Sequence, residues 1–508
     1  MKTNLKSLVL VAVLSTGLPL LAFGCGNSPP AAPDSGMDGD TDTDSDSDSD
    51  TDTDSDSDSD SDSDTGIPDG DGDGLADDFE DELGTDPEDE DSDGDGASDL
   101  VEWVAGTDPL DPEDNPANNG DFYFLMPFQD DPDPEVGTLA FGSELGRADL
   151  YILMDTSGSM GTPITELQAA MTDTIVAGAA ALIPDLWFGL GNFEDYPVSP
   201  HGAVDNVPFA LAQRTTDDAA ALQTAVDTLV AYNGGDYPES QVPALWATAT
   251  GGALEGYVEA QDACVGTEVG YPCFRRGALP IIVMVTDNEF HNDYDDNAPY
   301  TVIDPPAPTW DETLAALRGI HAKVPSVFLD NGSVAAGEAD CNQLALETGT
   351  VDADDAPITL SEGASWATLG ESIVSLVTSV TVDVPYGQVT ATAFDDDADE
   401  VDAVAAFIER IEADEDGGEE DPDNPGVFCL GGLATTDLGD DGHPDAFVGL
   451  LPGTTICFDV VPKTNETVDE QPEPMVYPAL IDVIADEVTL LDSRTVLFLV
   501  PPSPPITE

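Results

Sequence analysis

Three oxygen-bearing side chains alternate directly after an apolar stretch. Tyr151–Met154 is predicted to be a buried strand, and Asp155, Ser157 and Ser159 follow it at every second position. At the carboxyl end of a strand, just before a helix, such side chains project toward one point. One carboxylate and two neutral hydroxyls leave a bound Mg²⁺ (or Mn²⁺) electrophilic, with coordination positions open for further ligands. This DxSxS motif therefore predicts a metal site.

A second set of carboxylates forms an internal repeat. The predicted ligands occupy positions 1, 3, 5, 9 and 12 of two loops: Asp69, Asp71, Asp73, Asp77 and Glu80, then Asp91, Asp93, Asp95, Asp99 and Glu102. Gly74 and Gly96 stand at position 6 of each loop, where Ca²⁺ loops need a sharp turn. Each loop is followed by Gly-Thr-Asp-Pro. The repeat resembles the thrombospondin type 3 repeats, which implies folding around Ca²⁺ with little hydrophobic core.

The N-terminus has the architecture of an export signal. Lys2 and Lys6 precede an apolar stretch, Leu8–Phe23, that ends at Gly24 and Cys25. A cysteine at this place resembles the bacterial lipobox, which implies lipidation of Cys25 and a cell-surface lipoprotein of the bacterial outer membrane. Acyl chains would hold the protein stably on that membrane. The alternative is an ordinary secretory peptide with an incidental cysteine.

The charge balance excludes several classes of partner. Of 508 residues, 11 are Lys or Arg and 106 are Asp or Glu, which gives a formal net charge of −95. Nucleic acid is excluded because its phosphates require a positive surface, and membrane contact is expected only through the lipid anchor. Residues 26–68 include a strict alternation of Asp with Thr or Ser and are predicted to form a disordered linker.

Five cysteines remain after the lipobox, and an exported chain meets an oxidising compartment. Cys264 and Cys273 form a close local pair, and Cys429 and Cys457 share the last domain. We therefore expect these two disulfides and an unpaired Cys341.

The remaining sequence has two parts with different patterns of apolar residues. Apolar stretches of strand length alternate with amphipathic helical stretches over residues 146–384, which predicts an α/β doubly wound domain with a parallel sheet. Residues 385–508 are β-rich and predict a small all-β domain. The predicted chain is multidomain, with a signal peptide at 1–25, a linker at 26–68, calcium repeats at 69–115, and then these two domains.

Four segments of the α/β stretch resemble, in the same order, the von Willebrand factor A domain of the integrin β-subunit inserted-domain type. Tyr151–Ser159 resembles the strand and DxSxS motif of its metal-ion-dependent adhesion site, and Gly191–Pro200 resembles its FxDxPVSP segment. Asp236–Glu239 resembles its DxPE loop, and Ile281–Asp287 resembles its fourth strand. The resemblance implies a Rossmann-like fold that binds a protein ligand.

The same resemblance implies two neighbouring metal sites. The adhesion site would hold Mg²⁺ or Mn²⁺ with Asp155, Ser157, Ser159, Glu239 and Asp287. The adjacent calcium site would use Asp195, Asp236, the carbonyl of Pro238 and Glu239. Gly234 stands where the family has an Asn, which implies weaker binding of this second ion.

Motifs for catalysis are absent from the sequence. Its four histidines are His201, His291, His321 and His443, and none belongs to HExxH. His201 and His291 are expected on loops near the metal sites, where they could touch a ligand, although exposed side chains without a role are the favoured alternative. We therefore expect that the chain is not an enzyme.

These observations favour a surface lipoprotein that binds a partner's acidic side chain through Mg²⁺. The competing hypothesis is a calcium-stiffened envelope or matrix component whose metal site only stabilises the fold. A third is an enzyme, or a scaffold subunit of a transport complex.

Overall fold

The computed structural model describes residues 68–116, 122–261, 264, 266, 268–330, 335–363, 366–395 and 401–503. The predicted signal peptide, the lipidation residue Cys25 and nearly all of the predicted linker lie outside these ranges. Residues 65–508 form one compact unit. Its first elements are the two short helices of the calcium repeats, α1 (Asp77–Leu83) and α2 (Asp99–Ala105).

The part that carries the DxSxS motif is built on a six-stranded sheet with strand order β5-β4-β3-β6-β7-β8. Its strands are β3 (Arg147–Asp155), β4 (Asp185–Phe193), β5 (Ala210–Thr216), β6 (Leu279–Thr286), β7 (Ser326–Leu329) and β8 (Thr359–Glu362). Neighbouring strands are parallel except β5, which pairs antiparallel with β4. Every residue of β6 is buried, because both faces of the sheet are covered, and its sequence is accordingly apolar without alternation.

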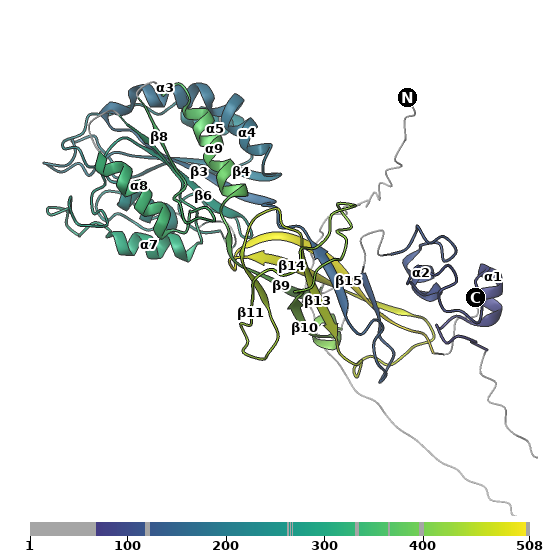
Figure 1. The fold of residues 1–508 in the computed structure, drawn as a ribbon. Helices are drawn as coiled ribbons and strands as arrows, with labels where there is room; N and C mark the ends of the chain where they lie inside the picture. The colour runs from purple at the N-terminus through teal and green to yellow at the C-terminus, as the bar shows by residue number, and fades with distance from the viewer. Residues whose placement is uncertain are drawn as a thin grey trace, which may run out of the picture. The chain divides into compact units, whose positions relative to one another are not determined.

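Helices lie on both faces of this sheet (Figure 1). One face carries α3 (Gly161–Ala170), the π-helix η2 (Met171–Val176), α4 (Ala177–Ala180), α5 (Ala219–Val226) and α9 (Leu369–Val382). The other carries α6 (Gln241–Thr250), α7 (Trp310–Gly319) and α8 (Ala335–Glu347). A short 3₁₀ turn, η1 (Gly158–Met160), lies between β3 and α3.

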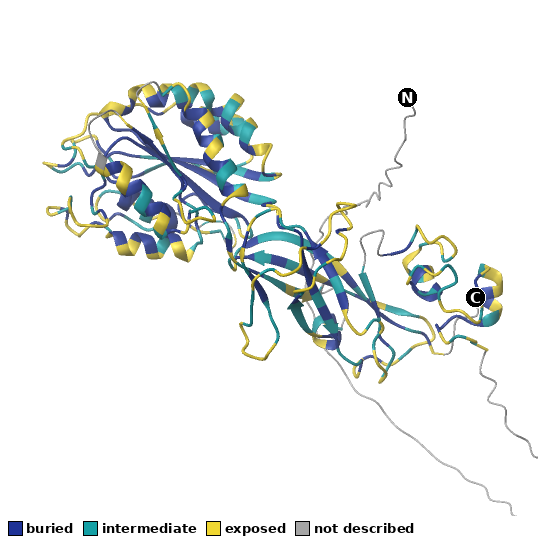
Figure 2. Cartoon of the chain, viewed as in Figure 1, coloured by how far each residue is buried: buried dark blue, intermediate teal, exposed yellow. Residues whose placement is uncertain are grey.

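Alternate residues of β3 divide between two hydrophobic cores. Ile152 and Met154 pack into one core, and Tyr151 and Leu153 pack into the other. Figure 2 shows these strands as buried and the outer faces of the helices as exposed. Burial on both sides therefore fixes β3 in place, including its last residue, Asp155.

Two further sheets enclose a separate core. A six-stranded sheet has the order β1-β15-β14-β9-β12-β11, and a three-stranded sheet has the order β10-β13-β2. Their strands are β1 (Phe122–Leu125), β2 (Gly137–Phe141), β9 (Tyr386–Asp395), β10 (Ile408–Ala413), β11 (Thr435–Thr436), β12 (Ala446–Leu450), β13 (Ile456–Pro462), β14 (Met475–Ala485) and β15 (Thr489–Val500), with helix α10 (Ala403–Phe407) before β10. In β14, Ala479, Ile481 and Val483 are buried between less buried neighbours, as expected for a strand with one covered face.

The predicted fold class, an α/β doubly wound domain followed by a small all-β domain, is wrong. The chain is built from mixed sheets, and only 23% of it is helical. The antiparallel strand β5 breaks the expected all-parallel sheet. The β-rich part is also neither small nor purely C-terminal, because β1 pairs with β15 and β2 pairs with β13. These two early strands are short, and their partners lie more than 300 residues later, so local periodicity could not assign them.

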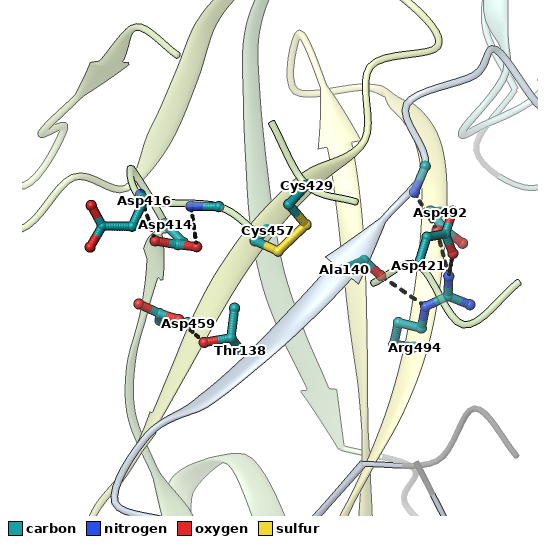
Figure 3. Close-up of a disulfide and its surroundings, with 12 residues drawn as sticks. Thr138, Ala140, Asp414, Asp416, Asp421, Cys429, Cys457, Asp459, Asp492 and Arg494 are labelled. Carbon is teal, nitrogen blue, oxygen red and sulfur yellow. Dashed lines mark hydrogen bonds and ion pairs between the residues drawn. A yellow bond between two sulfur atoms is a disulfide. The ribbon is translucent and has the colours of Figure 1, made fainter. Parts of the chain in front are cut away.

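Both predicted disulfides are present. Cys264 bonds to Cys273, and Cys429 bonds to Cys457, each pair with a Cα–Cα distance of 5.6 Å. The second disulfide joins β13 to the segment before β11 and packs with Ala140, whose carbonyl accepts from Arg494 Nε (Figure 3). Arg494 forms ion pairs with Asp421 and Asp492 there. The last domain is therefore cross-linked by both a covalent bond and buried charge pairs.

Cys341 is the unpaired thiol, as predicted, and it is fully buried in α8. Burial raises its pKa well above the ordinary value, which keeps the thiol protonated and unreactive at neutral pH. We expect iodoacetamide to modify Cys341 only after denaturation. Peptide mapping of native and denatured protein checks this, and rapid labelling of the native protein would contradict it.

Candidate functional site

Three neighbouring strands bring the predicted metal ligands to one edge of the sheet. β3 lies between β4 and β6, and all three are parallel. Asp155 is the last residue of β3, Asp287 follows β6 directly, and Asp195 lies two residues after β4. The chain continues from β3 to β4 on one side, whereas β6 on the other side comes later, so the strand order reverses at β3 and a space for ligands opens at this edge.

Close contacts and hydrogen bonds between side-chain oxygens connect the DxSxS motif to Asp287. The Ser157 Oγ lies 3.4 Å from the Ser159 Oγ, and the Ser159 hydroxyl donates to Asp287 Oδ1 at 3.1 Å. The Ser157 amide donates to Asp155 Oδ1 at 2.8 Å, and the Thr286 hydroxyl donates to Asp155 Oδ2 at 2.7 Å. The set consists of carboxylate and hydroxyl oxygens, which are the donors that Mg²⁺ prefers. We call Asp155, Ser157, Ser159, Glu239 and Asp287 the DxSxS cluster.

Glu239 completes the DxSxS cluster from the loop before α6. Its side chain is buried, and burial together with the nearby Asp155, Asp195, Asp236 and Asp287 raises its pKa to about 11. Burial and the charge of Asp287 likewise raise the pKa of Asp155 to about 7. Among the described residues, the ion pairs of Lys and Arg all lie elsewhere. A divalent cation would therefore neutralise the negative charge of these neighbouring carboxylates.

The residues predicted for the adjacent calcium site have unexpected neighbours. Asp195 and Asp236 come together, but His201 and His291 lie with them, and each of the four offers one ligand atom within 4.8 Å of the others. The predicted fourth element, Pro238, is only partly buried on the loop between Asp236 and Glu239. We call Asp195, His201, Asp236 and His291 the His–Asp cluster.

The expectation that His201 and His291 are exposed is wrong. Their exposed fractions are 5% and 3%. The sequence does contain a positional clue to the burial of these histidines. His201 lies six residues after Asp195, and His291 lies four residues after Asp287. The segments that follow β4 and β6 thus each supply a predicted ligand acid and a histidine. Residue type alone does not reveal this, since loop histidines are commonly exposed.

The two calcium loops have nearly the same geometry. In the first, the amide of Gly72 donates to Asp69, and that of Leu75 donates to Asp73. In the second loop, the corresponding donors are the amides of Gly94 to Asp91 and of Ala97 to Asp95. Gly74 and Gly96 have φ values of 105° and 101°, which other residues rarely adopt. The first three aspartates of each loop offer ligand atoms within 4.8 Å of one another.

The last acid of each calcium loop is fully buried. The side chains of Glu80 and Glu102 carry oxygens that find no hydrogen-bond partner among the described residues, as do Asp71, Asp93 and Asp95. Burial and neighbouring aspartates raise the pKa of Glu80 to about 7 and that of Glu102 to about 8. Such orphaned carboxylate oxygens at the positions of a calcium loop fit a bound Ca²⁺.

The repeats have more core than expected. Leu75, Phe79 and Leu100 pack together with Leu499 of β15, and the Tyr123 hydroxyl donates to the carbonyl of Gly96 at 3.0 Å. The two repeats are also joined, because the Leu100 amide donates to Asp73 Oδ2 at 3.0 Å. They are therefore attached to the β-rich part through apolar contacts as well as through the chain.

Comparison with known proteins gives distant structural similarities. The pilus adhesin SpaC from Lactobacillus rhamnosus GG, in its open conformation, is 12% identical with a TM-score of 0.28, over 73% of this chain and 46% of that one. Proximal thread matrix protein 1 from the mussel byssus is 12% identical with a TM-score of 0.27, over 48% of this chain and 47% of that one. The chain thus spans less than half the length of either protein. No curated protein sequence matches it.

Within the described ranges, no helix has the length and apolarity that a bilayer span requires.

Residues 69–89 and 91–112 match the family of bacterial TSP3 repeats. The paired loops, their buried glutamates and this match agree on one assignment. Residues 69–112 are bacterial thrombospondin type 3 repeats, and Ca²⁺ is the ion that their ligands indicate.

Proposed function

We propose that the protein is a cell-surface lipoprotein that binds an acidic side chain of a partner protein through an ion in the DxSxS cluster. The ion would be Mg²⁺ or Mn²⁺, held as in a metal-ion-dependent adhesion site. The lipid on Cys25 would anchor the chain in the outer membrane, and the linker and calcium repeats would hold the binding part away from it. The proposed activity is binding and involves no catalysed reaction.

One observation carries this proposal: the DxSxS cluster is buried on one side and open on the other. Asp155 is fully buried and Ser157 nearly so, whereas Ser159 is exposed. An ion held by all three would keep a coordination position toward solvent. A carboxylate of a partner could fill that position, because the metal would bridge two groups that otherwise repel.

The surroundings of the DxSxS cluster suit a protein partner. Tyr232 and Tyr237 have exposed fractions of 42% and 75%. The Tyr232 amide donates to the carbonyl of Thr156, inside the motif, and Tyr237 lies two residues before Glu239. Exposed tyrosines are enriched where proteins bind each other, so these two would flank the bridging ion.

The proposal predicts capture that depends on the ion. A soluble Cys25→Ser form, immobilised and incubated with envelope extract, should retain a partner in Mg²⁺ or Mn²⁺. The partner should be released by EDTA and displaced by millimolar glutarate, which supplies a free carboxylate. Mass spectrometry of the eluate measures both effects. Capture that persists in EDTA, or that glutarate leaves unchanged, would contradict a carboxylate bridged by metal.

A further inference from the structure

We propose that the His–Asp cluster is a site for a transition-metal ion of the zinc type, distinct from the magnesium and calcium sites. Its ligands are the imidazoles of His201 and His291 and the carboxylates of Asp195 and Asp236. This differs from the oxygen-only calcium site that sequence resemblance implied at this place. The proposal does not depend on partner binding.

The distances within the His–Asp cluster match a small coordination sphere. His291 Nε2 lies 3.6 Å from Asp195 Oδ2 and 3.5 Å from Asp236 Oδ1. Zn²⁺ binds nitrogen and oxygen at about 2.0–2.2 Å in tetrahedral geometry, so its ligand atoms lie about 3.3–3.6 Å apart. Since all four ligand atoms lie within 4.8 Å of one another, small side-chain rotations suffice to close the sphere.

Four buried atoms in the His–Asp cluster have no hydrogen-bond partner among the described residues. They are Asp195 Oδ2, Asp236 Oδ1, His201 Nε2 and His291 Nε2, one from each member. Buried polar atoms are seldom left unpaired, because the desolvation they suffer is then not compensated. One shared cation would satisfy all four at once.

The other nitrogen of each imidazole is already occupied in the way that metal-binding histidines require. His291 Nδ1 lies 2.7 Å from the carbonyl of Ala298, which can only accept, so this nitrogen carries the proton. His201 Nδ1 lies 3.1 Å from Asp236 Oδ2. Both arrangements leave the Nε2 lone pair free, and such outer hydrogen bonds orient metal-binding histidines.

An aromatic enclosure holds the ligands in position. The ring of Tyr300 lies over His291 with centroids 4.1 Å apart and contacts His201 at 4.9 Å. Its hydroxyl donates to Asp195 Oδ1, which also accepts from the Tyr196 amide at 2.6 Å. The carboxylate is thus fixed through one oxygen while the other faces the His–Asp cluster. The side chains are preorganised, and three of the four ligand residues are buried, whereas Asp236 is partly exposed.

The donor set selects the class of ion. Ca²⁺ and Mg²⁺ prefer oxygen ligands, whereas imidazole nitrogen suits Zn²⁺ and its neighbours in the first transition row. Two carboxylates and two neutral imidazoles carry a charge of about −2, which one divalent ion neutralises.

The test uses the full exported chain as its soluble Cys25→Ser form, freed of metal and dialysed into millimolar Mg²⁺ and Ca²⁺. We expect one added Zn²⁺ per chain to bind, and Co²⁺ to give the intense visible absorption of four-coordinate cobalt. His201→Gln and His291→Gln should each weaken binding by more than about 100-fold, because loss of an outer partner alone costs about 10–100-fold. His443→Gln is the matched control, since His443 is partly exposed and pairs with Glu412 elsewhere.

Each outcome bears on the His–Asp cluster separately from partner binding. Asp155→Asn should leave the cobalt spectrum unchanged, so failure of magnesium-dependent capture would not affect this result. Absence of the spectrum and of bound Zn²⁺ in the parent would overturn the proposal, as would unchanged binding in a folded His201→Gln. Near-ultraviolet circular dichroism verifies folding. If His291→Gln unfolds, His201→Gln decides; the His201 imidazole contacts the rings of His291 and Tyr300 and the Asp236 carboxylate.

Discussion

Removal of calcium should open residues 69–112 to proteases while the rest of the described chain stays protected. The buried carboxylates of Glu80 and Glu102 would then lie beside other acids without a compensating charge. The small core of Leu75, Phe79 and Leu100 contributes too little burial to hold the loops alone. Extracellular calcium modules bind at about 10⁻⁴–10⁻³ M, so protection should return over that range. Limited proteolysis with peptide mapping measures it.

The direction of the pH effect follows from the raised pKa values. Glu80 and Glu102 titrate near pH 7 and 8 in the folded repeats, above their ordinary value of 4.5. The folded state therefore holds more protons than the unfolded state between these limits, and its calcium-free stability falls as pH rises through them. In calcium-free buffer, protection should be greater at pH 5 than at pH 9. Saturating calcium should remove most of this difference.

Two variants separate charge from calcium binding. Glu102→Gln keeps the shape of the side chain but removes its charge, so at pH 8 the calcium-free protein should resist cleavage better than the parent. The same variant should gain less protection from calcium in the second repeat. Glu82→Gln alters an exposed glutamate of α1 and should behave as the parent. Calcium-independent protection of the parent would refute metal-dependent folding of the repeats.

The sequence predicted which side chains lie together locally better than it predicted the architecture. The spacing of acids and glycines in the repeats depends only on contacts within about twelve residues, and the loops fold as that spacing indicated. The DxSxS cluster also follows from where β3, β4 and β6 end, since apolar strands and the acids after them are adjacent in sequence. Local pattern is sufficient for both.

The sequence did not reveal which strands pair over long distances along the chain. β1 has four residues, and nothing in them identifies β15 as its partner. The antiparallel direction of β5 depends on its connection to β4, because strand sequences do not encode direction. The burial of His201 depends on contacts with His291 and Tyr300, which lie about 90–100 residues later. Each error thus arose where tertiary contacts override local preference.

Asp155→Asn should abolish ion-dependent binding and leave the fold intact. Asparagine can still accept from the Ser157 amide, and the Thr286 hydroxyl can rotate to accept from the new amide group. β3 is held by burial on both faces, so its last side chain is not needed for the core. Loss of a charged ligand should weaken Mn²⁺ binding by more than about 100-fold. Electron paramagnetic resonance of free Mn²⁺ measures that change, with one equivalent of Zn²⁺ and millimolar Ca²⁺ present to fill the other sites.

The stability of Asp155→Asn without metal decides between binding and structural roles. Burial and Asp287 raise the pKa of Asp155 to about 7, so at pH 8 its charge destabilises the metal-free fold. The variant should therefore melt in EDTA at the same temperature as the parent or higher. Thr286→Val removes the hydroxyl that donates to Asp155 and accepts from Gln241 and from the Asn288 amide, and it should weaken Mn²⁺ binding by about 10–100-fold. Asp205→Asn, on an exposed loop, should change neither.

Two results would contradict this account in different ways. If Asp155→Asn unfolds in EDTA, the Asp155 carboxylate is required for a stable fold, and the structural hypothesis explains the DxSxS cluster better. If it folds, loses Mn²⁺ and still captures the same partner, the ion does not form the bridge. Only a folded variant that loses both ion and partner supports adhesion through the metal, because burial holds β3 whereas charge holds the ion.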